Sequence, residues 1–463
     1  MLQHNNGIQQ TAGKCSGPVS RRQFLRVGAL ALGGLSLAEV LAARAAAGTE
    51  RADTAVILLY LMGGPSQLET YDLKPDAPSE YRSVFKPIAT NVPGISICEH
   101  YPLQARMADK FTLIRSIHHT INIHNDGGIL VFTGKAPTRP DPSSQAVSEH
   151  PDFGAIASKM RGDHPDGLPR YVATPRKLTM TQPAYLGTQH GPFVSGYPSA
   201  QGFPLTGLRL PVAVNGERLE ERRRLLDEFD RLRRDIDRNG SLEATDKFRA
   251  HAFRILTNST MAKAFDLDQE PDRLAERYGR HRWGRQCLLA RRLVEAGSTV
   301  VTVVLDSAAD GPEQNQWDDH AGQNGKPGHF AMFMRNRMPY LDQSLSALID
   351  DVYARDLDRK VLIVVMGEFG RTPRISSNSL GVGRDHWPAA QSVLVSGGGF
   401  RMGQVIGATN GKAEFPTERP YSPQDLLATI YKHLKIDPEH SFLDHFGRPV
   451  PILSEGKAIA ELG

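Results

Sequence analysis

The chain has 463 residues, 23% of them charged, and a formal net charge of +4. A chain of this length can bury a large core without disulfide bonds, so it does not belong to the class of small proteins that depend on disulfides for stability. The first 47 residues carry the whole net charge, since five basic side chains there outweigh one acidic one, and this excludes a basic nucleic-acid surface on the remainder. The basic residues are Lys14, Arg21, Arg22, Arg26 and Arg44, and the acid is Glu39.

Residues 20–26 read Ser-Arg-Arg-Gln-Phe-Leu-Arg and precede an apolar stretch over 27–42. This pattern is typical of a twin-arginine signal, and the small residues that follow predict cleavage near Gly48. We therefore expect a signal peptide over 1–47, and export of the rest to the periplasm or the extracellular space by the twin-arginine translocation machinery. The alternative is an uncleaved amphipathic anchor. No later segment predicts a membrane span, which needs about 20 apolar residues.

Continuous apolar runs rich in β-branched residues predict four buried strands. The runs cover residues 54–62, 298–305, 360–366 and 391–396. A predicted helix precedes the second run, over 283–296, and another precedes the third, over 330–357. Buried strands that alternate with helices indicate an α/β fold, with a mainly parallel sheet and helices on both faces.

A long helical insertion separates the first predicted strand from the others, and its clearest helix covers residues 216–238. Acidic and basic residues interleave there, which favours a solvated face over contact with a polyanion. A last helix is predicted to begin after Ser422, an N-cap residue followed by Pro423, and to end near Leu434. Since no repeat or low-complexity linker interrupts the chain, we expect residues 48–463 to form one domain.

Polar residues follow the predicted strands, and in open α/β sheets the ligand site lies beyond the carboxyl ends of the strands. After the first strand, the pair Gly63-Gly64 permits a tight turn that we expect to expose three polar side chains. These are Ser66, Glu69 and Asp72. The second strand is followed by Asp306 and by Trp317-Asp318-Asp319-His320, and the third by Glu368, Arg371, Arg384, Asp385 and His386.

Turns that leave one sheet edge would bring five of these side chains together, namely Asp318, His320, Glu368, Asp385 and His386. Mixed carboxylates and imidazoles suit Zn²⁺, Mn²⁺ or Fe, whereas carboxylates alone suit Mg²⁺ or Ca²⁺. We therefore predict a divalent metal site or an oxyanion site at this edge. Arg371 and Arg384 would either hold an anionic substrate through bidentate contacts or form ion pairs with Glu368 or Asp385.

Three further histidines, His118, His119 and His124, are candidates of second rank. They would add metal ligands or a general acid, or else make structural hydrogen bonds. Two cysteines remain beyond the predicted signal peptide, Cys98 and Cys287. They could form one disulfide, but the length of the chain favours two buried thiols.

Five motifs in order along the chain carry a family resemblance. They are Ser-Arg-Arg-Gln-Phe-Leu at 20–25, Gly-Gly-Pro-Ser-Gln at 63–67, Trp-Asp-x-His at 317–320, Gly-Glu-Phe-Gly-Arg-Thr-Pro at 367–373 and Gly-Arg-Asp-His-Trp-Pro at 383–388. Through them the chain resembles the bacterial family known as domain of unknown function 1501. That family is grouped with the alkaline phosphatase-like superfamily of sulfatases, phosphatases and cofactor-independent phosphoglycerate mutases. The resemblance implies a three-layer sandwich with metal ligands at strand ends.

By position in these motifs, Asp318 and His320 resemble the superfamily's Asp-and-His ligand pair, and His386 resembles its late histidine. The chain departs from the superfamily in two places. Glu368-Phe369 stands where relatives have Asp-His, and Met62-Gly63-Gly64 stands where they have an Asp at the strand end. The resemblance therefore implies fewer ligands than a two-metal site needs. Neither Cys98 nor Cys287 has the Cys-x-Pro-x-Arg context of a formylglycine sulfatase.

Ser66 is the best remaining hydroxyl nucleophile, with Thr70 behind it, although a water activated by the metal would need neither. The first hypothesis is an exported metal-dependent hydrolase that acts on phosphate or sulfate esters of small molecules or polysaccharides. Its predicted ligands are Asp318, His320, Glu368 and His386, with Asp385 as a ligand or an orienting residue and Arg371 as an anion clamp. The rival hypothesis is a non-catalytic binding or assembly module at the cell surface that keeps the fold.

Overall fold

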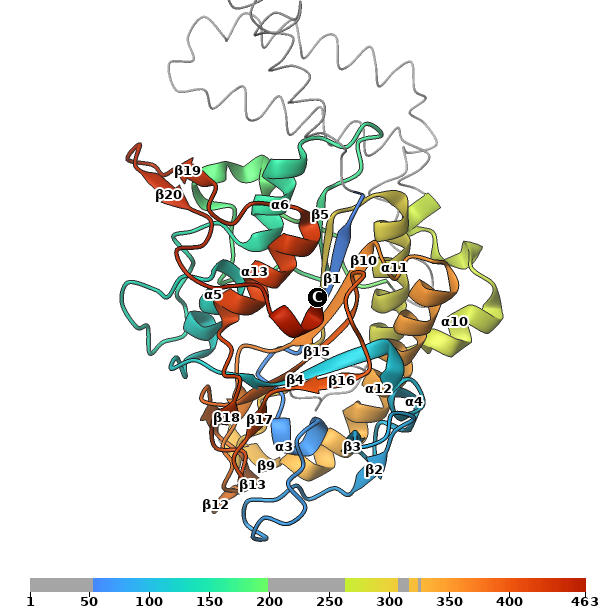
Figure 1. Ribbon diagram of the computed structural model, residues 1–463, viewed down its shortest axis with the longest axis vertical. Coiled ribbons are helices and arrows are strands. Elements are labelled where there is room, and N and C mark those ends of the chain that lie inside the picture. Colours follow the sequence, from blue (N-terminus) through green and yellow to red (C-terminus); the bar gives the residue numbers. More distant parts are fainter. Residues whose placement is uncertain (1–52, 199–262, 307–315, 324–325) are drawn as a thin grey trace, which may run out of the picture. The chain divides into compact units, whose positions relative to one another are not determined.

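The computed structural model describes residues 53–198, 263–306, 316–323 and 326–463. An eight-stranded sheet lies at its centre, in the order β16-β4-β15-β10-β1-β7-β5-β6 (Figure 1). In that order the strands are Gln404–Ile406, Phe111–Ile117, Gln391–Gly397, Val361–Met366, Ala55–Tyr60, Val300–Val304, Tyr171–Thr174 and Phe193–Val194. β15 runs antiparallel to both of its neighbours, whereas the other adjacent pairs of this sheet are parallel. The predicted mainly parallel sheet is confirmed.

Strand β1 lies in the middle of the sheet, between β10 and β7. Successive side chains of a strand point to opposite faces, so its continuous apolar run can serve two cores at once. Val56 packs into one hydrophobic cluster and Ile57 into the other, and both are fully buried. The same alternation continues along β10, which explains why neither strand shows a polar face in the sequence.

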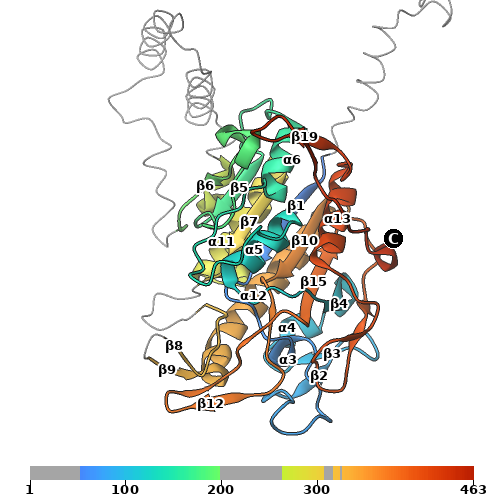
Figure 2. The same cartoon turned by 90° about the vertical axis from the view of Figure 1, so that its left-hand side faces the viewer.

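Helices cover both faces of the sheet. One face carries α5 (His124–Thr133), α6 (Phe153–Arg161) and α13 (Pro423–Leu434), which belong to one apolar cluster. The other carries α10 (Asp272–Tyr278), α11 (Arg282–Ala296) and α12 (Phe330–Ala354), which belong to the second. Figures 1 and 2 show the two groups on opposite sides of the strands. The protein is therefore a three-layer α/β structure, as predicted.

The predicted elements within the described residues are present with small shifts. β1, β7, β10 and β15 lie within or beside the four predicted runs, and α12 ends three residues earlier than predicted. Helix α13 begins with the predicted cap, since the Ser422 hydroxyl accepts a hydrogen bond from the Asp425 amide and the Asp425 carboxylate binds the Ser422 amide. The leader over 1–47 and the helix predicted over 216–238 lie outside the described residues.

The direction of β15 has a consequence for the site. Because β15 is antiparallel to β10, its amino end lies at the edge where β10 and β1 have their carboxyl ends. Gly383–Pro388 precedes β15 and therefore reaches the sheet at that edge. This connection brings a late motif of the sequence beside the residues that follow β1 and β10.

Four strands of the sheet, β4, β5, β6 and β16, were not predicted from the sequence. β4 contains Thr112 and Arg115, which break its apolar run, although Thr112 is buried. The other three have four, two and three residues, which is too short for a periodic pattern. These strands are held by their neighbours in the sheet, and the local sequence alone does not specify them.

Short elements gather beyond the carboxyl edge of the sheet, where Figures 1 and 2 show α3, β9 and β12. The short helices are α3 (Gln67–Thr70) and α4 (Pro102–Ala105). Three short ladders pair β2 (Pro87–Ala89) with β3 (Ser96–Cys98), β11 (Gly370–Arg371) with β14 (His386–Trp387), and β17 (Ala408–Thr409) with β18 (Pro416–Glu418). A small four-stranded sheet joins β12 (Ser376–Asn378), β13 (Gly381–Gly383), β9 (Lys326–His329) and β8 (Gly322–Gln323). A further ladder, of β19 (Ser441–Leu443) and β20 (Pro449–Pro451), lies near α6 at the other end of the sheet (Figures 1 and 2).

Cys98 and Cys287 are buried free thiols, which confirms the prediction. Burial raises the pKa of Cys98 and of Cys287 to about 12, so both stay protonated at neutral pH. Among the helices in the described part of the chain, none combines the length and the apolar character that crossing a membrane requires.

Candidate metal centre

The turn after β1 is built from two glycines in a conformation that other residues rarely adopt. Gly63 has φ +107° and Gly64 has φ +84°. A Cβ on Gly63 would lie 2.6 Å from the Asp318 amide nitrogen, and one on Gly64 would lie 2.6 Å from the Phe369 carbonyl oxygen. The Gly63 amide also donates to Glu368 Oε1 at 3.1 Å. The glycine pair thus lets two distant segments pack against the end of β1.

The segment 316–320 is anchored by two of its residues and presents two others to the site. Trp317 is fully buried, and the Arg337 guanidinium lies over its ring, 4.6 Å from the centroid. Asp319 is buried in an ion pair with the same arginine. Between and after these anchors, Asp318 and His320 point toward the carboxyl edge of the sheet, where both enter the contacts described next.

Three imidazoles converge on one carboxylate oxygen. Asp318 Oδ1 lies 3.3 Å from His124 Nε2, 3.0 Å from His320 Nε2 and 3.2 Å from His386 Nε2. His320 Nε2 and His386 Nε2 are themselves 3.0 Å apart. One ligand atom from each of these four residues lies within 4.8 Å of the other three. We call His124, Asp318, His320 and His386 the four-residue cluster.

An oxygen atom holds the other ring nitrogen of each histidine in the cluster. Glu368 Oε1 lies 2.6 Å from His124 Nδ1, Asp385 Oδ1 lies 2.7 Å from His320 Nδ1, and the Asn122 carbonyl oxygen lies 2.7 Å from His386 Nδ1. A carbonyl or ionised carboxylate oxygen only accepts hydrogen bonds, so each Nδ1 must donate. In a neutral ring the proton is then on Nδ1, and Nε2 presents a lone pair to the centre of the cluster.

The close contacts within the cluster shift the pKa values of its four residues. Burial lowers the pKa of His124, but its hydrogen bonds to Asp318 and Glu368 outweigh burial and raise the pKa to about 9. The hydrogen bond to Asp318 also raises the pKa of His320, whereas burial lowers the pKa of His386. Burial opposes ionisation of Asp318, yet hydrogen bonds from the three imidazoles hold its pKa far below the usual range. Protons on His124 and His320 therefore balance the carboxylate when no other cation is bound.

The donor set fits a transition-metal ion. Imidazole nitrogens and carboxylate oxygens bind Zn²⁺ at about 2.0–2.2 Å, so ligands at the corners of a tetrahedron lie about 3.3–3.6 Å apart. The four contacts of 3.0–3.3 Å between cluster atoms are close to that spacing. The imidazole side chains are 20–28% exposed, so the cluster is open to solvent on one side. Three nitrogen donors suit Zn²⁺, Mn²⁺ or Fe better than Mg²⁺ or Ca²⁺.

The two predicted carboxylates outside the cluster have different surroundings. Glu368 is buried, and its Oε2 accepts a hydrogen bond from the Tyr60 hydroxyl at 2.7 Å. Asp385 is 55% exposed, and its Oδ2 accepts from the Ser376 hydroxyl at 3.1 Å. The structure therefore places both on the outer nitrogens of cluster histidines.

Arg371 is fully buried and forms an ion pair, but with Asp318 at 2.5 Å and not with the predicted Glu368 or Asp385. Its Nε donates to the Gly64 carbonyl at 2.9 Å, and a further donor binds the Gly63 carbonyl. These contacts fix the guanidinium between the glycine turn and the cluster, because a buried cation is stable only where its donors find acceptors.

Arg384 is also fully buried, and its ion-pair partner is Glu69 at 2.9 Å, not Asp385 or Glu368. Its other donors bind backbone carbonyls of residues 81, 82, 372 and 373. These contacts connect Glu69 and residues 81–82 to the segment that carries His386.

The predicted exposure of three residues after the glycine turn is wrong. Ser66, Glu69 and Asp72 are 1%, 0% and 3% exposed, because α3 folds them under the neighbouring segments. The Ser66 hydroxyl donates to Glu69, and the Thr70 hydroxyl donates to the Ser66 carbonyl at 2.7 Å. Asp72 pairs with Lys74 at 3.0 Å. Glycine at 63 and 64 allows the turn, but it does not determine which way the following side chains point.

Other candidates lie near the edge without joining the cluster atoms. His119 accepts at Nδ1 from the Ile121 amide, and its Nε2 donates to the Glu368 carbonyl at 2.7 Å. Burial lowers the pKa of His119 to about 4, so the ring is neutral and structural. The Asp306 carboxylate pairs with Arg176 at 3.1 Å.

From the sequence His124 was a candidate of second rank, but the structure places it in the four-residue cluster. His124 is the first residue of α5, and the loop before it follows the unpredicted strand β4. A strand at 111–117 would have placed this loop at the carboxyl edge and moved His124 to first rank. The interrupted apolar pattern of β4 hid that signal.

The sequence model of the family described as "Protein of unknown function (DUF1501)" matches residues 53–462, and the chain belongs to this family. Comparison with curated proteins gives no match. Among solved structures, the lipoteichoic acid synthase LtaP from Listeria monocytogenes is similar over 84% of this chain and 73% of its own, at 9% identity and a TM-score of 0.34. A 2-O GAG sulfatase is similar over 88% and 73%, at 10% identity and a TM-score of 0.40. The phosphonate monoester hydrolase SpPMH from Silicibacter pomeroyi is similar over 88% and 76%, at 12% identity and a TM-score of 0.34.

Proposed function

We propose that this member of the DUF1501 family is an exported hydrolase of phosphate or sulfate esters that holds one divalent metal ion in the four-residue cluster. One observation carries the proposal: three Nε2 atoms face Asp318 Oδ1 while every Nδ1 atom is already engaged as a donor. In the metal-free protein, protons on His124 and His320 satisfy Asp318. A shared metal ion would replace those protons and accept the lone pairs of the three Nε2 atoms.

The residues around the cluster have distinct roles in this proposal. Glu368, Asp385 and the Asn122 carbonyl hold the outer ring nitrogens, which fixes the tautomer and the orientation of each imidazole. The buried guanidinium of Arg371 positions Asp318 from behind, so we assign it this role in place of the anion clamp. A divalent ion in such a site lowers the pKa of a coordinated water and polarises an ester oxygen.

The attacking group in this proposal is water. Ser66 was the best hydroxyl in the sequence, but it is 1% exposed and donates to the buried Glu69. A substrate could reach that hydroxyl only after α3 moved. We therefore assign Ser66 to the support of the turn, together with Thr70.

Export through the twin-arginine machinery belongs to the same proposal, because that route carries proteins that have already folded. A metal could then be loaded in the cytoplasm before transport. Cluster residues 124, 318, 320 and 386 lie far apart in the sequence, so the site forms only in the folded chain. The mature protein would act in the periplasm or outside the cell, on small-molecule or polysaccharide esters and without a nucleic-acid partner.

One observation supports a second candidate function. Four protein donors fill the coordination shell of a tetrahedral ion, as in structural zinc sites. A tetrahedral ion here would make the chain a non-catalytic binding or assembly module at the cell surface. An ion that accepts five or six ligands, such as Mn²⁺, would keep room for water and substrate.

Metal analysis and ester hydrolysis, measured on the same preparations, test the proposal. We expect about one metal ion per chain and hydrolysis of p-nitrophenyl phosphate or p-nitrophenyl sulfate, with Mn²⁺ or Fe²⁺ at least as active as Zn²⁺. His124→Ala and His386→Ala should lower the rate at least about a hundredfold. The matched control is His190→Ala, a half-buried histidine outside the cluster.

Three outcomes are informative about the choice between a metal-dependent hydrolase and a non-catalytic module. No stoichiometric metal in wild type, or unchanged hydrolysis in both cluster variants, contradicts the proposal. One tightly held ion without hydrolysis of either ester supports the non-catalytic module. Loss of activity in the His190→Ala control would mean that the variants report general damage to the fold.

A further inference from the structure

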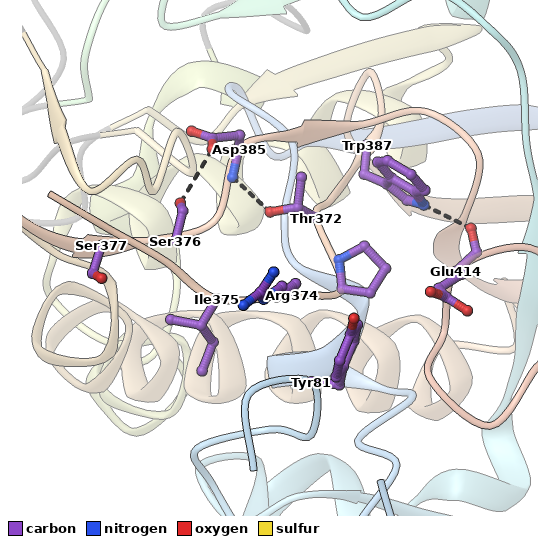
Figure 3. A pocket seen from close by; sticks show the side chains of 10 residues that line it. Tyr81, Thr372, Arg374, Ile375, Ser376, Ser377, Asp385, Trp387 and Glu414 are labelled. Atoms are coloured by element: carbon purple, nitrogen blue, oxygen red, sulfur yellow. Dashed lines mark hydrogen bonds between the residues drawn. The ribbon is translucent and has the colours of Figure 1, made fainter. Parts of the chain in front are cut away.

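A cavity of about 510 Å³ adjoins the four-residue cluster (Figure 3). Asp385 joins the two, since its Oδ1 contacts His320 Nδ1 at 2.7 Å and its side chain also lines the cavity. The walls come from residues 372–377, from Asp385 and Trp387 on either side of His386, and from Tyr81 and Glu414. A molecule with its ester at the cluster would therefore place its remaining part here.

Two aromatic rings contribute flat apolar surface to the cavity. Trp387 is half-buried, and its Nε1 donates to the Glu414 carbonyl at 2.6 Å, which fixes the indole. Tyr81 is half-buried as well, and Lys412 Nζ lies over its ring, 4.4 Å from the centroid. Figure 3 shows both rings at one end of the cavity, and Asp385 with Ser376 at the other.

Hydroxyl and carboxylate groups also line the cavity. Thr372 accepts at Oγ1 from the Asp385 amide at 2.9 Å, and Ser376 donates to the Asp385 carboxylate at 3.1 Å. The charged lining residues are one cation, Arg374, and two anions, Asp385 and Glu414. This balance gives no excess of positive charge for a second anionic group.

We propose that the cavity binds a sugar ring of the substrate, so that the ester cleaved at the cluster is carried by a saccharide. The C–H face of a pyranose packs on an aromatic ring, while its ring hydroxyls need acceptors such as carboxylates and side-chain hydroxyls. Trp387 and Tyr81 supply the first requirement, and Asp385 and Glu414 supply the second. The assignment of the ester end rests on the proposed function, whereas the sugar pocket rests on its own lining.

The volume supports a ligand of this class. Small-molecule pockets measure about 300–1,000 Å³, and a single sugar ring with its hydroxyls fills about a third to a half of the 510 Å³ here. One or two rings would fit. A long aliphatic chain would remove water from the carboxylates of Asp385 and Glu414 without offering them a hydrogen bond.

Intrinsic fluorescence can report on this cavity, because a ligand there contacts only one of the three tryptophans. The chain has three tryptophans, of which Trp283 and Trp317 are 1% and 0% exposed, while Trp387 lines the cavity. The experiment titrates the metal-stripped full chain with unesterified hexoses, hexosamines, uronic acids and their disaccharides, and follows tryptophan emission together with saturation-transfer NMR. We expect at least one saccharide to bind and to shift the emission.

Substitutions away from the cluster test the assignment. Tyr81→Ala and Glu414→Gln should each weaken saccharide binding about fivefold or more, while Tyr81→Phe, which keeps the ring, should bind like wild type. Phe446→Ala removes an aromatic ring that is 82% exposed elsewhere, and should leave binding unchanged. The metal content of all four variants should equal that of wild type.

The possible failures are distinguishable. If no saccharide in the panel binds, or if binding persists unchanged in both Tyr81→Ala and Glu414→Gln, the sugar pocket is wrong, even when wild type hydrolyses aryl esters. If saccharides bind but no ester is hydrolysed and no metal is held, the proposed function is wrong and the pocket stands. Binding lost equally in Phe446→Ala overturns the assignment to this cavity.

Discussion

At the scale of single residues, the account depends on the hydrogen-bond partners of three imidazole rings. His124 has a carboxylate on each nitrogen, Glu368 at Nδ1 and Asp318 at Nε2. In our proposal the contact with Glu368 orients the ring, whereas the contact with Asp318 lies where the metal ion would bind. A test must therefore change one contact and leave the other.

Replacing Glu368 with Gln removes the charge at Nδ1 and nearly preserves the shape of the side chain. We expect metal affinity to fall about tenfold to a hundredfold, the usual effect of losing a carboxylate behind a ligand histidine. Asp385→Asn should have a smaller effect, because Asp385 is 55% exposed and water can replace it. Competition with a chelator of known affinity measures both. Equal affinity of Glu368→Gln and wild type would contradict the orienting role.

Proton release gives a second test at this scale. The pKa of His124 in the metal-free protein is about 9, and that of His320 is also raised. A metal must displace these protons, so binding at pH 7 should release about one to two protons and should strengthen as pH rises toward 9. Calorimetry in buffers of different ionisation enthalpy counts them. Affinity independent of pH between 6 and 9 would contradict this arrangement.

The metal-free protein should show the opposite trend in stability. The pKa of His124 is 6.5 without its partners and about 9 in the fold, so protonation stabilises the folded state. That contribution is fully present below pH 6.5 and is lost as pH rises through 9. The difference in unfolding free energy between wild type and His124→Gln, measured without metal, should therefore shrink across this window. A difference that grows with pH would have the wrong sign.

At the scale of elements, the glycine turn after β1 joins the sheet to the site. A Cβ on Gly63 would meet the Asp318 amide at 2.6 Å and the Trp317 carbonyl carbon at 2.9 Å. We expect Gly63→Ala to lower the unfolding free energy by about 2–3 kcal/mol and to weaken metal binding, because the 317–320 segment must move. Denaturant unfolding and metal analysis check both effects.

Gly94 offers a matched control for that substitution. It also has positive φ, +83°, but a Cβ there would meet no atom within 4 Å. Gly94→Ala should therefore show only the backbone penalty, about 1–2 kcal/mol, with unchanged metal binding. If the two variants lose the same stability and hold the same metal, close packing at Gly63 does not support the site.

Much of the element structure could be predicted from the sequence, for a physical reason. Strands such as β1 and β10 are buried on both faces, so every residue in them is apolar and the run is unmistakable. The same property conceals direction, because such a run looks alike in a parallel and an antiparallel strand. The antiparallel direction of β15 therefore emerged only from its pairing with β10.

Part of the candidate site followed from sequence, and part required the fold. Asp318, His320 and His386 lie in conspicuous motifs beyond predicted strands, and the structure brings them together. The sequence could not show which carboxylates face the centre and which face the outer ring nitrogens. That distinction is made by a few ångströms of backbone position, as Glu368 shows by its contact with His124 Nδ1 at 2.6 Å.

At the scale of the whole molecule, metal binding couples segments that are far apart in the chain. A ligand that binds only the folded state stabilises it by RT ln(1 + [L]/Kd), or about 4 kcal/mol at a free concentration a thousand times Kd. We expect removal of metal to lower the melting temperature, and its return to restore it. His386→Ala keeps three of the four cluster residues, so metal should raise its melting temperature much less than that of wild type. A metal-induced shift as large as that of wild type would place the ion elsewhere.

The central claim is that one ion sits among the four atoms of the cluster, and X-ray absorption spectroscopy of the metal-loaded protein tests it most directly. The account predicts a first shell of three imidazole nitrogens and one or more oxygens at about 2.0–2.2 Å, with the outer-ring scattering of histidine. In His386→Ala the number of imidazoles should fall by one. A shell without imidazole, or one unchanged in His386→Ala, would contradict the account.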